Sequence, residues 1–356
     1  MAKRSIKRTT LQQVADRAGV HQSTASRALD PRTRHLITDD VVAKVERAVA
    51  QLHYRHNRVA AGLRTNRTRA IGIIVPDITN MLFPPIIRGV ENRIAEDGFV
   101  AMIAHTDGDP AKERSMIETF LSHGSDGLVV ASVSLEDQAI AAAAREGTPV
   151  VTVNRRLAGD TISSVTHDES AGIGAVLKHL TDLGHTEFAF LSGPTSSSTG
   201  RSRLAAYKQW ARRLGIKTRE GSVAEAQAFV EEEGRRRADD LLATGVRFTA
   251  LVCASDILAV GAIETLRKWG VGCPADVSVT GFNDIPFVDR INPPLTTVHG
   301  EHYKLGWTAA EMLLQDLAVP TKKREVRHTV IPVTFVARES SAPAPDAAAR
   351  LRRAPV

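Results

Sequence analysis

Basic side chains are concentrated at the N-terminal end of this 356-residue chain. Residues 1–69 contain 15 Lys or Arg and 5 Asp or Glu, a net charge of +10, whereas residues 70–356 contain 31 and 35, a net charge of −4. Clustered guanidinium and ammonium groups bind the phosphates of nucleic acids. The charge distribution therefore favours nucleic acid over a membrane surface as the partner of the first segment.

Residue patterns that carry enzymatic chemistry are missing from the sequence. It has no GxxxxGK[ST] loop, no GxGxxG after a strand, no HExxH and no GxSxG. Residues 193–200 are rich in Gly and Ser but lack the lysine of a phosphate-binding loop, so we interpret them as a mobile loop over a ligand cleft. Cys253 and Cys273 have no zinc-site spacing and form no disulfide framework. We therefore predict a protein that is not an enzyme and needs no cofactor or metal.

Neither end of the sequence predicts export or membrane insertion. The basic start at residues 1–8 is not followed by an apolar run, so we expect no signal peptide. No stretch approaches the roughly 20 apolar residues of a membrane helix. We expect a cytoplasmic protein.

The patterned part of the basic segment predicts two short helices joined by a tight turn. Thr10 and Gln13 have capping-box spacing, and apolar residues follow at helical intervals up to Gly19, which tolerates a positive φ. A second helix is expected at 23–29, and a third begins after Thr38. Helix, glycine turn and helix at this spacing form a helix-turn-helix.

Residue 71 begins a long alternation of strands and helices. The expected strands are 71–75, 100–105, 127–131, 150–154, 188–192, 250–254 and 277–282. The expected helices are 84–96, 111–123, 136–146, 169–183, 201–214, 224–243 and 256–269. Apolar strands alternating with helices predict parallel sheets covered on both faces, and the length favours two doubly wound lobes. Ligands of such sheets bind at the carboxyl ends of the strands, here between the lobes.

Several segments together resemble the lac repressor/galactose repressor family. They are residues 10–29, the segment 54–63, IGIIVPDITN at 71–80, DGLVV at 126–130, HLTDLGH at 179–185, GFNDI at 281–285 and PPLTT at 293–297. The resemblance covers about residues 10–336. It implies an N-terminal all-α helix-turn-helix head and an α/β core of two doubly wound parallel-sheet lobes, similar to periplasmic sugar-binding proteins.

The resemblance implies which head residues contact DNA. The second helix would enter the major groove, with Gln22 as the main base-reading residue beside Ser23 and Arg27, because Gln bridges adenine and Arg bridges guanine. Thr24 and Ser26 would contact phosphates, and Thr10 belongs to the same DNA-binding set. In the segment 57–64, Asn57, Ala60 and Leu63 would occupy the minor groove, with Leu63 wedged between base steps. His56 stands where family members usually have Pro, which affects the rigidity of this hinge.

The resemblance also implies the residues that bind a small-molecule effector between the lobes. They are Phe83, Asn154, Arg155, Asp168, Arg203, Ser255 and Asn283. Amide and guanidinium groups suit the hydroxyls of a polyol, and an aromatic ring stacks on a sugar ring. Asn283 and Ser255 replace the Asp and Asn of many members. For Asp256 and Asp284 a ligand role and a purely structural role both stay open.

These observations give one functional prediction with its alternatives. We expect a homodimeric transcription repressor that binds a near-palindromic double-stranded DNA operator and a carbohydrate effector. A purine or another small metabolite is the alternative effector, and the effector can be an inducer or a co-repressor. The rival functions are a periplasmic-type receptor and an enzyme built on the same lobes. The expected domains are a head (1–56), a hinge helix and linker (57–69), a core (70–340) and a disordered tail (341–356).

Overall fold

The computed structural model describes residues 9–30, 33–54, 68–159 and 161–345. The chain divides into two compact units, residues 1–68 and 69–356. The first unit is the head and the second is the core.

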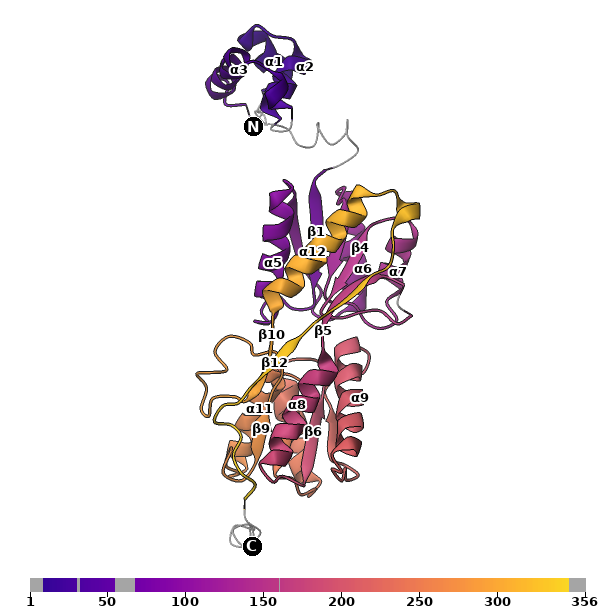
Figure 1. Ribbon diagram of the computed structural model, residues 1–356, viewed down its shortest axis with the longest axis vertical. Helices are drawn as coiled ribbons and strands as arrows, with labels where there is room; N and C mark the ends of the chain where they lie inside the picture. The colour runs from indigo at the N-terminus through magenta and orange to yellow at the C-terminus, as the bar shows by residue number, and fades with distance from the viewer. Residues whose placement is uncertain (1–8, 31–32, 55–67, 160, 346–356) are drawn as a thin grey trace, which may run out of the picture. The chain divides into compact units, whose positions relative to one another are not determined.

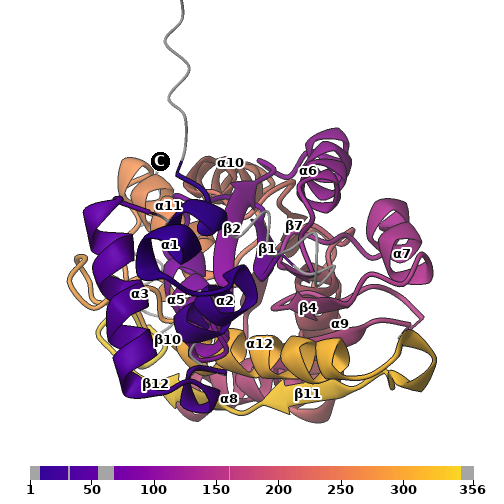
Figure 2. The same ribbon diagram turned by 90° about the horizontal axis from the view of Figure 1, so that it is seen from above.

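The described head consists of helices that enclose a small apolar core (Figure 2). Its elements are α1 (Leu11–Ala18), α2 (Gln22–Leu29), the 3₁₀ turn η1 (Arg34–Leu36) and α3 (Asp39–Gln51). The capping box of Thr10 and Gln13 is confirmed, and Gly19 ends α1 with a φ of 69°. Val14, Ala15, Ala25 and Val45 are fully buried, so the small side chains of α2 let it pack closely on its neighbours.

The first lobe of the core contains a sheet of six parallel strands in the order β11-β5-β4-β3-β1-β2. The strands are β1 (Ala70–Val75), β2 (Val100–His105), β3 (Gly127–Val130), β4 (Val150–Val153), β5 (Ser163–His167) and β11 (His328–Ile331). The helices of this lobe are α5 (Phe83–Glu96), α6 (Pro110–Ser122), α7 (Gln138–Arg145) and α12 (His302–Ala318), with the 3₁₀ turn η2 (Thr321–Lys323). Helices α5 and α12 lie side by side (Figure 1).

The second lobe is built on the same plan with a smaller parallel sheet, ordered β7-β6-β8-β9. Its strands are β6 (Phe188–Ser192), β7 (Val223–Glu225), β8 (Ala250–Cys253) and β9 (Ser278–Thr280). Its helices are α8 (Glu169–Asp182), α9 (Ser198–Arg213), α10 (Glu231–Ala243) and α11 (Asp256–Lys268). The prediction of two doubly wound parallel-sheet lobes is confirmed.

The chain passes between the lobes three times at one edge (Figure 1). The passages are the step from β5 to α8, strand β10 (Thr297–Gly300) before α12, and strand β12 (Val333–Val336) after β11. Strands β10 and β12 pair antiparallel. The backbone N–H of Asp168 donates to the carbonyl of Ile331 over 3.0 Å, which ties the first passage to the third.

In each lobe, two helices approach each other closely at a pair of glycines. A side chain at Gly89 of α5 or Gly306 of α12 would collide with the backbone of the opposite helix. Gly234 of α10 and Gly261 of α11 make the same arrangement in the second lobe. Only the absence of a Cβ permits this spacing, so these four positions fix the helix pairs.

Three sequence-based expectations differ from the structure. Residues 223–225 form strand β7 and α10 begins only at Glu231, so the helix expected at 224–243 is shorter at its start. Residues 341–345, expected in a disordered tail, are bound to the second lobe, where the N–H of Ala344 donates to the carbonyl of Leu183 over 2.9 Å. Residues 193–200 do not form a free loop, because Ser197 caps α9 and residues 197–200 are buried.

The described residues contain neither a membrane-spanning helix nor a metal-binding cluster. No helix there is both long and apolar enough to cross a membrane. No group of three or more His, Cys, Asp or Glu residues in the same ranges is placed to hold a metal ion.

Candidate DNA-reading helix and effector site

Helix α2 presents the predicted base-reading side chains on its exposed face. Gln22 is its first residue, and Gln22, Ser23 and Arg27 are exposed, whereas Ala25 and Ala28 are buried against the rest of the head. Thr24 and Ser26 are partly buried at the margin of this face. The sequence therefore separates a small apolar side that packs from a polar side that is free to contact a ligand.

The start of α2 is fixed by a residue that sequence reasoning missed. His21 is the N-cap, and its Nδ1 accepts a hydrogen bond from the N–H of Ser23 over 3.3 Å. This contact holds the backbone beside Gln22, so His21 positions the first turn. An N-cap is usually Ser, Thr, Asp or Asn, which is why the sequence pattern did not reveal it.

The remaining basic groups of the head differ in how they are bound. The Nε of Arg17 donates to Oε1 of Gln51 over 2.9 Å, and Arg34 pairs with Glu46 over 2.7 Å. Arg27 makes no ion pair within the described part of the head, so its guanidinium is available. The Thr10 hydroxyl accepts from the N–H of Gln13, which gives it a capping role. His56, Asn57, Ala60 and Leu63 lie outside the described residues.

In the core, Arg203 is the centre of a buried polar cluster in the second lobe. It is 2% exposed and forms an ion pair with Glu169 of α8 through Nε and Nη2. Its Nη1 donates to the carbonyl of Ala254, and its Nη2 donates to Oδ1 of Asn283 over 3.3 Å. The guanidinium carbon also lies 3.8 Å from the centre of the Phe282 ring. Four of the five N–H groups of Arg203 are thus engaged within the protein.

Three predicted effector residues lie around this cluster at the ends of strands. Ser255 follows β8 and caps α11, and Asp168 follows β5 and caps α8. Asn283 follows β9, has a φ of 114°, and its carbonyl accepts a 2.6 Å hydrogen bond from Nε2 of His302. The strained φ of Asn283 is held by these contacts, which aim its amide at Arg203.

Asn154 and Arg155 follow β4 of the first lobe, and Arg155 contacts the second lobe. Asn154 is buried with a φ of 66°, and its Oδ1 has no hydrogen-bond partner among the described residues. Arg155 lies over Phe229 of the second lobe, with 5.9 Å between the guanidinium carbon and the ring centre. Burial lowers the pKa of Arg155 to about 10, so the group stays protonated at neutral pH.

Two further hydrogen bonds join the lobes beside Arg155. The N–H of Leu135 donates to the carbonyl of Ser196 over 2.9 Å, and the N–H of Arg156 donates to Oγ of Ser198 over 2.9 Å. The loops after β3 and β4 therefore contact the residues that begin α9. Of the predicted effector residues, Arg155 lies on this line through its contact with Phe229 of the second lobe.

Phe83 does not join the polar cluster. It begins α5, is 2% exposed, and packs in the large apolar core of the molecule. The aromatic ring found at the lobe boundary is Phe229, which lies so close to Gly193 that a side chain there would overlap it. Sequence reasoning missed Phe229 because it lies in the segment that was expected to be helical.

Two buried histidines at the lobe junction were also missed. His167 ends β5 and His302 begins α12, and their ring centres are 5.1 Å apart. In the part of the chain that the structure describes, both ring nitrogens of His167 and Nδ1 of His302 have no hydrogen-bond partner. Burial lowers the pKa of His167 to about 3 and that of His302 to about 4, so both rings are neutral at neutral pH.

The structure gives Asp256 and Asp284 internal partners. The carboxylate of Asp256 accepts from the hydroxyl of Thr297 and from the N–H of Ile285, and burial raises its pKa to about 6. Asp284 pairs with Arg338 over 2.7 Å and contacts Nδ1 of His299 over 3.0 Å. These contacts support the structural role for both residues.

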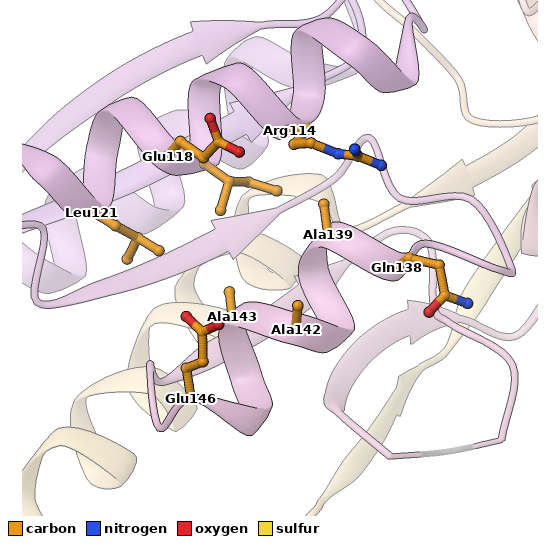
Figure 3. A pocket seen from close by; sticks show the side chains of 9 residues that line it. Arg114, Glu118, Leu121, Gln138, Ala139, Ala142, Ala143 and Glu146 are labelled. Atoms are coloured by element: carbon orange, nitrogen blue, oxygen red, sulfur yellow. The ribbon is translucent and has the colours of Figure 1, made fainter.

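Two surface hollows lie away from the lobe boundary. One, of about 240 Å³, lies between α6 and α7, where Arg114, Glu118 and Glu146 border an apolar floor (Figure 3). The other, of about 280 Å³, lies beside α9 and is lined by Lys208, Arg212 and Thr218, among others. Neither contains a predicted site residue.

Comparison with known proteins supports both parts of this description. Residues 10–57 match the model "Bacterial regulatory proteins, lacI family", and residues 177–341 match a periplasmic binding protein-like domain. The chain is 30% identical over 318 residues to a repressor named PurR from Photobacterium profundum, a match that covers 89% of this chain and 94% of the relative. The chain belongs to the lacI family of bacterial regulatory proteins.

Solved structures of this lacI family show the same fold over nearly the whole chain. A lac repressor dimer bound to operator and the anti-inducer ONPF matches with a TM-score of 0.81 and 27% identity, over 94% of this chain and 100% of that one. A complex of the regulator CelR with cellobiose matches with a TM-score of 0.71 and 25% identity over the same shares. As a lacI-family protein, the chain is a DNA-binding transcription regulator with a ligand-binding core.

Proposed function

We propose that this chain is a homodimeric repressor whose operator binding is controlled by a small molecule held between the two lobes. The observation that carries the proposal is the polar face of α2, where Gln22, Ser23 and Arg27 are exposed on a helix-turn-helix and Ser23 is hydrogen-bonded to His21. The match to an operator-bound lac repressor dimer supports it.

In the proposed complex, α2 lies in the major groove and reads base edges. Gln22 bridges an adenine and Arg27 a guanine, and each such contact contributes about 1–3 kcal/mol of discrimination. Thr10, Thr24 and Ser26 contact phosphates and fix the register. A two-fold dimer requires a near-palindromic operator.

The segment 57–64 completes the contact with DNA. An isolated helix of about eight residues is too short to be stable in water, so this segment gains its structure on DNA. Asn57 and Ala60 follow the minor groove and Leu63 wedges between base steps, which bends the duplex.

The effector binds where polar groups of both lobes meet. The proposed contacts carry amide, guanidinium, carboxyl and hydroxyl groups, and they are Asn154, Arg155, Asp168, Arg203, Ser255 and Asn283. Phe83 was also predicted to contact the effector, through its aromatic ring. Such groups suit a carbohydrate, and the CelR–cellobiose match supports this class, with a purine or another metabolite as the alternative.

Effector binding changes the angle between the lobes and so the pairing of the two hinge segments. To move an operator from mostly bound to mostly free, an effector must prefer the released state by about 5.5 kcal/mol. An effector that binds the same site but favours the DNA-bound state would act as a co-repressor. The protein binds DNA in the cytoplasm and catalyses no reaction.

The test starts from a random pool of double-stranded DNA. Selection with the full-length chain is expected to enrich a near-palindromic site, and the logarithm of its affinity should fall steeply and linearly with the logarithm of salt concentration, because lysines and arginines displace counterions. Enrichment of no sequence, or affinity independent of salt, would contradict the proposal.

A further inference from the structure

Arg155 is an unbalanced positive charge at the lobe boundary. Its Nη1 donates to the carbonyl of Ser132 over 3.2 Å, and its flat face lies over Phe229. Its Nε is buried and has no hydrogen-bond partner within residues 9–30, 33–54, 68–159 and 161–345. Across the described ranges, no ion pair includes Arg155. A guanidinium carries five N–H groups in a planar fork, so most of its donors are unused here.

The other charges of the site do not compensate Arg155. The charge of Arg203 is balanced by Glu169, with which it forms a buried ion pair. The acid that acts most directly on Arg155 is Glu113, which is 6% exposed and accepts from the hydroxyl of Ser132. Burial, together with the neighbouring acid Asp137, raises the pKa of Glu113 to about 8, so the carboxyl of Glu113 is mostly protonated at neutral pH. Asp137 itself is hydrogen-bonded to Glu113 and forms no ion pair with Arg155 among the described residues. Asn154 and Asn283, which follow the ends of their strands, are neutral amides.

A second source of positive potential lies beside the loop that carries Arg155. The loop that carries Arg155 is hydrogen-bonded to the first turn of α9 through Arg156 and Ser198. Helix α9 has 16 residues, and the N-terminal end of a helix carries the positive end of its dipole. A guanidinium with unused donors thus lies on a loop that is bonded to a helix start, and among the described residues the buried Oδ1 of Asn154 has no hydrogen-bond partner.

We propose that the effector of this protein is an anion whose carboxylate or phosphate group is bound by Arg155. The inference rests on the proposed effector site and specifies its ligand class: a sugar acid or a sugar phosphate rather than the neutral sugar. A sugar acid and a sugar phosphate both carry an oxyanion that accepts bidentate hydrogen bonds from a guanidinium. The hydroxyls of the same ligand face Asn154 and Asn283.

The experiment uses full-length protein and matched ligand sets in titration calorimetry. Each set contains a neutral aldose, the corresponding aldonate and the corresponding sugar phosphate, for example glucose, gluconate and glucose 6-phosphate, with ribose and its derivatives as a second set. We expect at least one anionic member to bind roughly 10- to 100-fold more tightly than its neutral parent, as hydrogen bonds to charged groups imply. Tighter binding of the aldonate would identify a sugar acid as the effector, and tighter binding of the phosphate would identify a sugar phosphate.

Arg155→Gln is expected to remove this difference, while Arg155→Lys retains part of it because the charge remains. Arg156→Gln is the matched control, since Arg156 is exposed on the same loop and should leave affinity unchanged. The proposal would be overturned if the neutral sugars bound more tightly than the anions or if no anionic member bound. It would also be overturned if Arg155→Gln bound the anion as tightly as the unchanged protein. The selection of operator DNA described above does not depend on the effector. It therefore tests the proposed function separately from the ligand class.

Discussion

Arg203 and Glu169 form a buried ion pair that links α9 to α8 in the second lobe. Nη2 of Arg203 lies 3.1 Å from Oε1 of Glu169, and Nε binds the other carboxylate oxygen, so the contact is bidentate. The same Nη2 reaches Asn283. Nη1 of Arg203 donates to the carbonyl of Ala254. One guanidinium therefore joins residues that follow β5, β8 and β9, which gives Arg203 a structural role in addition to its proposed contact with the effector.

Replacing Arg203 by Ala should destabilise the core strongly. The change leaves the Glu169 carboxylate buried without its cation, which costs about 3–5 kcal/mol. Urea unfolding of the full-length chain measures this loss. Lys178→Ala, which breaks the exposed pair with Asp182, serves as control and should cost less than about 1 kcal/mol. A loss for Arg203→Ala as small as that of the control would show that the ion pair is unimportant for stability.

Gln22→Ala should weaken operator binding at one base position of each half-site. Removal of a bidentate contact costs about 1–3 kcal/mol on the cognate sequence and little on a sequence already changed at that base. Affinities for a set of operators with single base changes locate the position. Gln12→Ala is the control, because Gln12 is exposed on α1 and bonds to Asp16. A uniform loss on all sequences would indicate a phosphate contact instead.

Glu113→Gln should change how stability depends on pH. The pKa of Glu113 is about 8 in the folded protein against an ordinary value of 4.5, so between these values the folded state holds a proton that the unfolded chain has released. Stability from this group therefore falls as pH rises from about 5 to about 8, by at most about 1.4 kcal/mol per pH unit. Unfolding of both proteins from pH 5 to 9 should give a difference that grows in favour of the variant. A constant difference would contradict the assignment.

Gly300→Ala should disturb the junction of the lobes. The added Cβ would lie 2.6 Å from the Cε1 atom of His167, whose ring is buried and has little room to move. Overpacking of this kind costs about 1–3 kcal/mol. In a His167→Ala background the same change should cost much less, and a double-mutant cycle measures this coupling. Equal costs in both backgrounds would show that the two residues do not oppose each other.

The head and most of the core could be predicted because their patterns are local. The helical spacing from Leu11 to Ala18 and apolar runs such as 71–75 belong to single elements, and both are confirmed. Strand β5, with the sequence SSVTH, and strand β11, with HTVI, are short and lack a long apolar run, so they were not predicted. They are strands because each pairs with a neighbour that is distant in sequence.

The parts of the site that sequence reasoning missed have the same cause. His167 and His302 lie at the ends of β5 and α12, and Phe229 lies in the loop between β7 and α10, all elements that were absent or misplaced in the prediction. The effector residues expected from the family resemblance, apart from Phe83, follow the ends of strands or belong to the Arg203 cluster. Their roles as ligand contacts remain predictions.

The three passages between the lobes have a consequence for how the protein is made. The first lobe is not a continuous piece of chain, because α12 and β11, at residues 302–331, complete it only after the second lobe has been synthesised. The described head, in contrast, ends at residue 54, and domains tend to fold in the order of synthesis. A chain that ends before residue 302 would therefore contain an intact helix-turn-helix on a core without the partner of α5. Late truncations are expected to separate DNA reading from its control by ligand.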